Sequence, residues 1–124
     1  MRKQYHFRPG PTGLRVWDID RLIALMLELP VVQVPLSAIR ELGEPYWYGL
    51  GEVPTCRSIA EHARLINEAD MSFPIILSSD GGVMDGMHRV AKAVMHGLDA
   101  VPAKRFVVDP KPDYVGIDPD TLPY

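Results

Sequence analysis

The segment from residue 74 to residue 98 constrains the fold of this 124-residue chain more than any other part of it. Residues 74–78 (Pro-Ile-Ile-Leu-Ser) are typical of a buried strand, and residues 79–82 (Ser-Asp-Gly-Gly) are typical of a hairpin turn. A second short strand is expected to end at Gly86, after which apolar residues recur with helical spacing as far as Gly97, a typical helix C-cap. The segment therefore predicts a strand, a turn, a second strand and a helix in direct succession.

The spacing of apolar residues predicts two further helices. Asp18 can cap the first, which is expected over about residues 18–29 and whose apolar stripe is wide enough to face a core. Thr55 or Ser58 can cap the second, which is expected to run to about Ala69.

Strands and loops are expected around these helices. Short strands are predicted at residues 14–17, 31–35 and 100–108. Pro102 favours an edge or entry position for the last of them, because proline has no N–H to donate. Residues 36–43 predict a brief helical turn, and residues 44–54 predict a loop. The Asp- and Pro-rich arm at residues 109–124 carries apolar side chains that could pin it to the body or to a second subunit.

Together these elements predict a single α+β (mixed α/β) domain over residues 1–124, built from a small sheet and about three helices. A chain of this length is long enough for one hydrophobic core and too short for two domains. The main part of the domain is expected at residues 31–108, preceded by the helix at 18–29 and followed by the arm at 109–124.

Charge and cysteine content narrow the function classes. The chain has 13 Lys and Arg residues against 16 Asp and Glu residues, a formal net charge of -3, so the overall basic character of many nucleic-acid-binding domains is absent. Its only cysteine, Cys56, cannot form an intramolecular disulfide, and no apolar run approaches the roughly 18 residues of a membrane span. No signal peptide is indicated either. These features predict a protein of the reducing cytoplasm.

The segment Asp85-Gly86-Met87-His88-Arg89, here called the box, is the strongest functional signal. A strand that stops at a glycine and continues directly into a helix exposes the N–H groups of the first helical turn, where the helix dipole also favours negative charge. Gly86 allows close approach of a bound group, Arg89 supplies a forked cationic donor suited to phosphate, and His88 supplies a second donor. Gly86, Met87, His88 and Arg89 are therefore predicted to bind phosphate.

With residues 31–39 and the predicted helix from Ser58, the box resembles the ParB/sulfiredoxin superfamily, in which a Gly-x-His-Arg or Gly-Glu-Arg-Arg element leads into a helix that holds nucleotide phosphates. The resemblance covers roughly residues 31–108 and implies a ParB/sulfiredoxin-like fold that binds ATP or CTP with Mg²⁺. Met87 stands where sulfiredoxins carry their reactive cysteine, so sulfinic-acid reduction is not expected. The chain also has no room for the helix-turn-helix domain of the partition proteins, so centromere binding in their manner is not expected.

A further branch of this superfamily, the free-serine kinases, implies a phosphotransferase or nucleotide-hydrolysing role. By that analogy Glu41 or Glu44 would be the catalytic base, and Mg²⁺ would bridge the phosphates. Asp85 could assist as a catalytic carboxylate, orient His88, ligate Mg²⁺ together with the phosphates or cap the helix.

Other interpretations remain open at this stage. The box could be a plain strand-to-helix turn. The chain could also be a non-catalytic DNA-associated or protein-interaction module that retains the box as an anion or ligand sensor, with any contact to DNA indirect and a homodimer as one arrangement. No metal site made by protein ligands alone is predicted, since the four histidines form no HxxxH pair, and His62 and His96 are expected on helix surfaces. The aromatic residues 46–48 could stack a nucleobase or cover the core. Arg57 and residues 104–105 could supplement phosphate binding.

Overall fold

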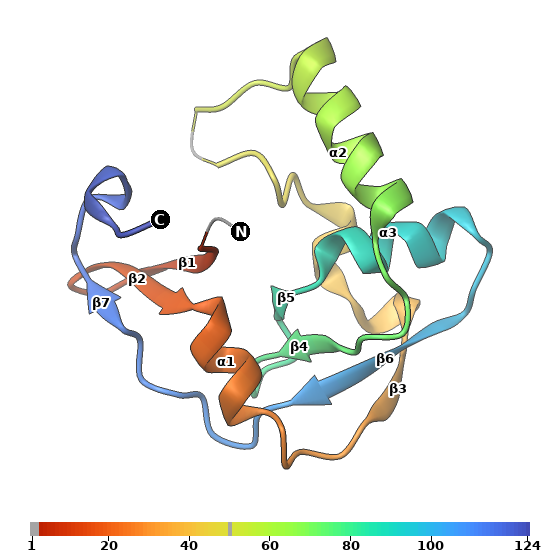
Figure 1. Ribbon diagram of the computed structural model, residues 1–124, viewed down its shortest axis with the longest axis horizontal. Coiled ribbons are helices and arrows are strands. Elements are labelled where there is room, and N and C mark those ends of the chain that lie inside the picture. Colours follow the sequence, from red (N-terminus) through yellow and green to blue (C-terminus); the bar gives the residue numbers. More distant parts are fainter. Residues whose placement is uncertain (1–2, 50) are drawn as a thin grey trace.

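The protein has a mixed α+β fold with three α-helices and two sheets, as expected. The computed structural model describes residues 3–49 and 51–124 (Figure 1). The helices are α1 (Ile19–Leu25), α2 (Cys56–Glu68) and α3 (Met87–Met95). The strands are β1 (Tyr5–Gly10), β2 (Gly13–Asp18), β3 (Val32–Pro35), β4 (Ile75–Leu77), β5 (Val83–Asp85), β6 (Ala100–Arg105) and β7 (Tyr114–Val115). Short 3-10 helices lie at Leu36–Ala38, Arg40–Gly43 and Pro119–Thr121.

The predicted hairpin of β4 and β5 is confirmed, and it lies in a four-stranded sheet with the order β3-β6-β4-β5. Alternate side chains of this hairpin enter two separate hydrophobic clusters, since successive strand residues point to opposite faces. Ile75, Leu77 and Val83 belong to one cluster, and Ile76 and Met84 belong to the other. The hairpin is therefore buried on both faces.

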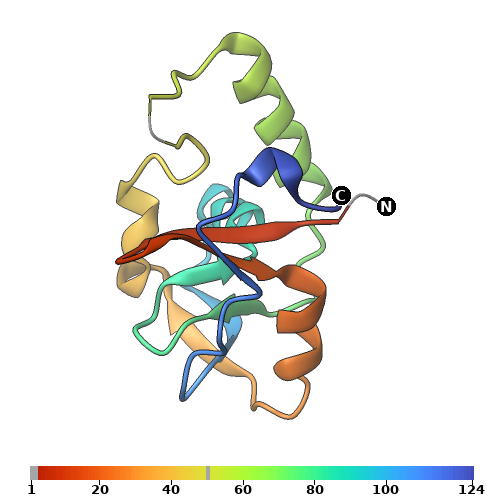
Figure 2. The same ribbon diagram turned by 90° about the vertical axis from the view of Figure 1, so that its left-hand side faces the viewer.

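Different elements cover the two faces of this sheet (Figures 1 and 2). The amphipathic helix α3 packs on one face and contributes Met87, Val90 and Ala93 to its cluster. The other face is covered by α1 and β2, whose largest buried side chains are Trp17 and Leu22. Strand β2 is the central strand of the second sheet, which has the order β1-β2-β7 and lies on this side of the molecule.

Strand β1 was not predicted, because residues 1–13 are polar and rich in Pro and Gly. It forms because all six of its residues pair with β2, from Tyr5 opposite Asp18 to Gly10 opposite Gly13. The carboxylate of Asp18 accepts from the N–H of Asp20, which confirms Asp18 as the cap of α1. The helix is shorter than expected and ends at Leu25.

Of the two positions expected for Pro102, the edge position is wrong, since β6 lies inside the sheet between β3 and β4, whereas the entry position agrees with the register. The parallel pairing with β4 begins only at Ala103, opposite Ile75, so the missing N–H of Pro102 removes no bond on that side. The strand also ends at Arg105 rather than at residue 108.

Helix α2 begins where expected, at a capping box formed by Thr55 and Ser58, and its C-cap is Ala69. None of its thirteen residues, all of them described, is buried. Its C-terminal end is held by Lys92 of α3, whose ammonium group donates to the carbonyls of Asn67 and Ala69. The helix therefore projects from the body of the molecule (Figure 1).

The C-terminal arm lies against the N-terminal sheet. Strand β7 pairs with β2, and the indole of Trp17 donates to the carbonyl of Pro110 at 2.8 Å. Near the end of the arm, the carbonyl of Pro123 accepts a hydrogen bond from the hydroxyl of Tyr5, and the rings of Tyr5 and Tyr124 meet edge to face. The start of β1 and the end of the chain are therefore side by side (Figure 2). Within the described residues, no helix is long and apolar enough to cross a membrane.

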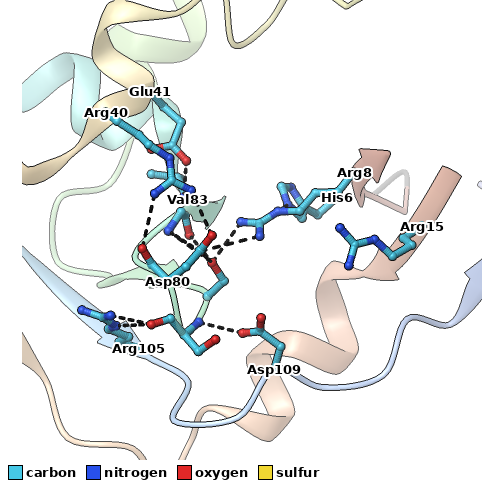
Figure 3. Close-up of polar contacts among 12 residues, drawn as sticks. His6, Arg8, Arg15, Arg40, Glu41, Asp80, Val83, Arg105 and Asp109 are labelled. Carbon is cyan, nitrogen blue, oxygen red and sulfur yellow. Dashed lines mark hydrogen bonds and ion pairs between the residues drawn. The ribbon is translucent and has the colours of Figure 1, made fainter. Parts of the chain in front are cut away.

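The turn between β4 and β5 is held by a group of charged contacts centred on Asp80 (Figure 3). The Asp80 carboxylate accepts from the hydroxyl of Ser78 and the N–H of Gly82, and it pairs with Arg8 of β1 and with Arg40 of the second 3-10 helix. These contacts join three segments that are distant in sequence.

The same turn is also tied to the end of β6 and to the C-terminal arm. Arg105 donates to the carbonyl of Ser79, and the N–H of Ser79 donates to Asp109 at 2.7 Å. The turn is therefore fixed from several sides at once.

Replacing Asp80 is expected to lower the free energy of unfolding at neutral pH and to reduce the loss of this free energy in acid. Hydrogen bonds from Ser78 and Gly82 hold the pKa of the Asp80 carboxyl well below its usual range. Its contribution is therefore present above about pH 4, the ordinary pKa of aspartate, and is lost as the pH falls further. Since the side chain is 57% exposed, solvent screens the ion pairs. Asp80→Asn should lower the free energy of unfolding at pH 7 by about 1 kcal/mol.

Urea denaturation at pH 7 and at pH 3 measures this effect. The difference in the free energy of unfolding between the wild type and Asp80→Asn should be smaller at pH 3 than at pH 7. The exposed Glu28→Gln variant serves as the control. An equal loss at both pH values would contradict the assigned role of the Asp80 charge.

Candidate functional site

The box lies where β5 ends and α3 begins, as predicted. Gly86 is the N-cap of α3 and adopts a left-handed conformation with a φ of 103°. A Cβ atom at this position would lie 2.7 Å from Ile75 Cγ2 and 2.7 Å from Arg89 Nη2. Glycine is required here both by the backbone angle and by the space that these side chains occupy.

No side chain caps the first turn of α3. Asp85 does not cap the helix; its carboxylate forms an ion pair with Arg89, at 3.1 Å between Oδ2 and Nη2. Both side chains are largely buried, with 17% of Arg89 and 23% of Asp85 exposed. Burial raises the pKa of the Asp85 carboxyl, while the Arg89 guanidinium opposes this rise. The first-turn N–H groups of α3 are therefore left for another acceptor.

His88 is part of a stack of three rings that connects the box to α2. Its Nε2 lies 2.9 Å from Nδ1 of His62, so the two imidazoles share a hydrogen bond. The indole of Trp47 lies nearly parallel to both rings, with centroid distances of 4.5 Å to His62 and 4.6 Å to His88. His62 lies on the surface of α2, as expected, and it is in addition a partner of the box.

A cavity of about 410 Å³ opens beside the box. Its wall combines four box residues with aromatic and apolar side chains from the start of the chain, the 44–54 loop, α2 and the C-terminus. The lining residues are Lys3, Gln4, Tyr5, His6, Phe7, Ile19, Tyr46, Trp47, Leu65, Met84, Asp85, Gly86, Met87, His88 and Tyr124.

Burial keeps two histidines and one tyrosine of this cavity wall uncharged at neutral pH. It lowers the pKa of His88 to about 4, with a further contribution from His62, and it lowers the pKa of His6 to about 4. Burial also raises the pKa of Tyr46 to about 12. The site can therefore offer neutral donors and acceptors at pH 7.

Glu41 and Glu44, the other predicted carboxylates, do not line this cavity. Glu41 is only 7% exposed, and its Oε2 accepts from the N–H of Val83 at 2.7 Å. Tyr46 donates its hydroxyl to the carbonyl of the same Val83, so these two side chains satisfy both backbone groups of Val83 on the edge strand β5. Glu44 is exposed in the loop that follows. Of the three predicted catalytic carboxylates, the structure brings only Asp85 to the cavity.

The aromatic loop is attached to the body rather than free. Besides the contacts of Tyr46 and Trp47, the hydroxyl of Tyr48 shares a hydrogen bond with the hydroxyl of Ser58 on α2. Lys104 donates to the carbonyls of Met26 and Leu27, so it has a structural contact away from the box.

Sequence reasoning missed the contributions of Tyr5, His6, Phe7 and Tyr124 to the cavity wall. They come from the two ends of the chain, which are joined by the pairing of β7 with β2 and by the contacts of Tyr5 with the C-terminus. No local pattern could have indicated them. Among the described residues, no group of three or more His, Cys, Asp or Glu side chains is arranged to hold a metal ion.

None of the family models, curated proteins or solved structures compared with this chain matches it. The resemblance to the ParB/sulfiredoxin superfamily therefore stays a prediction.

Substitutions of Glu41 should distinguish a structural role from a catalytic one. Glu41→Leu leaves the buried N–H of Val83 without an acceptor and should lower the free energy of unfolding by about 1–3 kcal/mol. Glu41→Gln keeps an acceptor oxygen and removes a buried charge, so its loss should be smaller. Urea denaturation measures both, with the exposed Glu44→Gln as control. A larger loss for Gln than for Leu would contradict this role.

Proposed function

We propose that this protein binds a nucleotide, or a closely related phosphate compound, in the cavity beside the box. One observation carries the proposal: the same cavity contains the uncapped first turn of α3 and a wall of aromatic side chains. A helix start attracts an anionic group, while aromatic side chains accept a flat apolar group. A nucleotide carries both.

The electrostatics of the box support an anion at the helix start. The N–H groups of the first turn and the helix dipole favour negative charge there, and no side chain caps this turn. The charge of Asp85, which would otherwise repel an anion, is balanced by Arg89. His88 lines the cavity and supplies a neutral ring nitrogen for a further hydrogen bond.

The size and wall of the cavity support a small organic ligand. A volume of about 410 Å³ falls within the range of roughly 300–1,000 Å³ found for small-molecule sites. The rings of Tyr5 and Tyr124 meet edge to face on the side provided by the chain ends. The cavity thus offers polar groups at the box for a phosphate and aromatic rings around it for a flat apolar group.

The positions of the carboxylates favour binding without catalysis. Transfer of a phosphoryl group to a hydroxyl uses a carboxylate that accepts the proton. Glu41 is engaged with Val83, and Asp85 is paired with Arg89. ATP and CTP are the ligands to try first, with Mg²⁺ carried by their phosphates as part of the ligand.

A nucleotide titration on matched variants tests the proposal. Thermal unfolding of the wild type is followed with ATP, ADP, CTP, GTP or inorganic phosphate, each with Mg²⁺. A ligand present at ten times its Kd should stabilise the protein by about 1.4 kcal/mol. His88→Ala should reduce this stabilisation, whereas His96→Ala, an exposed residue just beyond the other end of α3, should not. Arg89→Ala is a poor probe because it also breaks the Asp85 ion pair.

Two results would contradict the proposal. Equal stabilisation of the wild type and of His88→Ala would mean that the ligand binds elsewhere. No stabilisation by any of these compounds at millimolar concentration would exclude a nucleotide site of useful affinity. Nucleotide hydrolysis that depends on Glu41 or Asp85 would overturn the inference that the site binds without catalysis.

A further inference from the structure

The contact between His62 and His88 places a second imidazole beside the one that lines the cavity. Nδ1 of His62 and Nε2 of His88 are 2.9 Å apart, and the ring centroids are 5.2 Å apart. Trp47 lies nearly parallel to both rings, and the ring of Tyr48 meets His62 at an edge. The orientation of His88 is therefore set by contacts from α2 and from the aromatic loop.

We propose that His62 is a positioning residue for His88, and that the pair takes up one proton from solvent when an anion occupies the first turn of α3. This inference rests on the proposed function, because it needs an anionic ligand at the box. It assigns to a residue of α2 a role in a site that lies on α3.

The proton balance follows from the hydrogen bond. In the neutral pair of this proposal, His88 donates its Nε2–H to Nδ1 of His62, and Nδ1 of His88 carries no proton. The proton from solvent is added to this Nδ1. After uptake, the His88 imidazolium donates its Nε2–H to Nδ1 of His62, whose own proton is on Nε2. The Nδ1–H of His88 is then the donor left for the anion. No covalent bond other than the new N–H forms or breaks.

The surroundings of the pair explain why an anion is needed for this uptake. Without one, burial lowers the pKa of both imidazoles, and each ring would repel a charge on the other. The nearby anion reverses this balance, since an opposite charge at a few ångströms favours the protonated form. Other titratable or charged groups around the pair and the cavity are Lys3, Tyr5, His6, Tyr46, Glu61, Asp85, Arg89 and Tyr124.

These groups do not supply the uncompensated negative charge that the anion brings to the pair. Glu61 favours a charged His62, but it is itself paired with Arg64 at 2.9 Å. Asp85 is paired with Arg89, and the ammonium of Lys3 is paired with Asp18 at 3.0 Å. Each carboxylate near the pair thus already has a cationic partner.

Sulfate is the probe for this inference, because its charge does not change between pH 5 and pH 8. The full-length protein is titrated with sodium sulfate across this range, with sodium chloride at matched ionic strength as the reference. The Cε1–H resonances of His62 and His88 report occupancy and protonation together. Affinity should rise as the pH falls, by up to about tenfold per pH unit, which is the limit for uptake of one proton.

Two substitutions of His62 separate the hydrogen bond from the stacking. His62→Phe keeps a ring beside Trp47 but removes the acceptor for His88, so the pH dependence of sulfate affinity should be lost. His62→Asn supplies an acceptor oxygen near the position of Nδ1 and should restore most of it. His96→Phe is the control and should behave as the wild type. Calorimetry of the wild type in two buffers with different ionisation enthalpies counts the protons directly and needs no variant.

The outcomes separate this inference from the proposed function. Sulfate binding at the box with an affinity independent of pH would overturn the inference and leave the proposed function standing. An unchanged pH dependence in His62→Phe would remove the role of His62. No sulfate, phosphate or nucleotide binding by the wild type at any pH would overturn the proposed function and this inference with it.

Discussion

Burial of the β4–β5 hairpin on both faces is the constraint on which the rest of the structure depends. Its two strands are short, but their alternate side chains enter two different hydrophobic clusters. One cluster holds α3 and the other holds α1 and β2, so a shift of the hairpin by one residue would exchange the two sets of side chains. The contacts of Asp80 and Ser79 fix the turn at which the hairpin reverses, and they connect it to β1, β6 and the arm.

The same hairpin determines the chemistry of the site. Because β5 ends at Asp85 and the chain turns through Gly86 into α3, the first turn of the helix faces the cavity. The Asp85–Arg89 ion pair makes this turn less cationic than its sequence suggests, so the N–H groups and His88 are its main means of holding an anion. A nucleotide-binding role rests on that combination of helix start, neutral imidazole and aromatic wall.

Much of the fold could be predicted because local signals agree with one another. The capping residues Asp18 and Thr55, the turn at 79–82 and Gly86 were identified correctly, as each is specified by backbone chemistry within a few residues. β1 was missed because its strand character comes from pairing with β2 and not from its own composition. For Pro102, the edge position was wrong and the entry position was right, because a proline is tolerated inside a sheet where the adjoining ladder has not begun.

The sequence by itself determined the box and its position between a strand and a helix, because these depend on neighbouring residues. Only the tertiary structure decided what surrounds the box. It engaged Glu41 with the edge of β5, brought His62 to His88, and assembled a cavity wall from the two ends of the chain. These contacts join residues that are distant in sequence, and the energy that selects them comes from burial and pairing between elements, which no local pattern records.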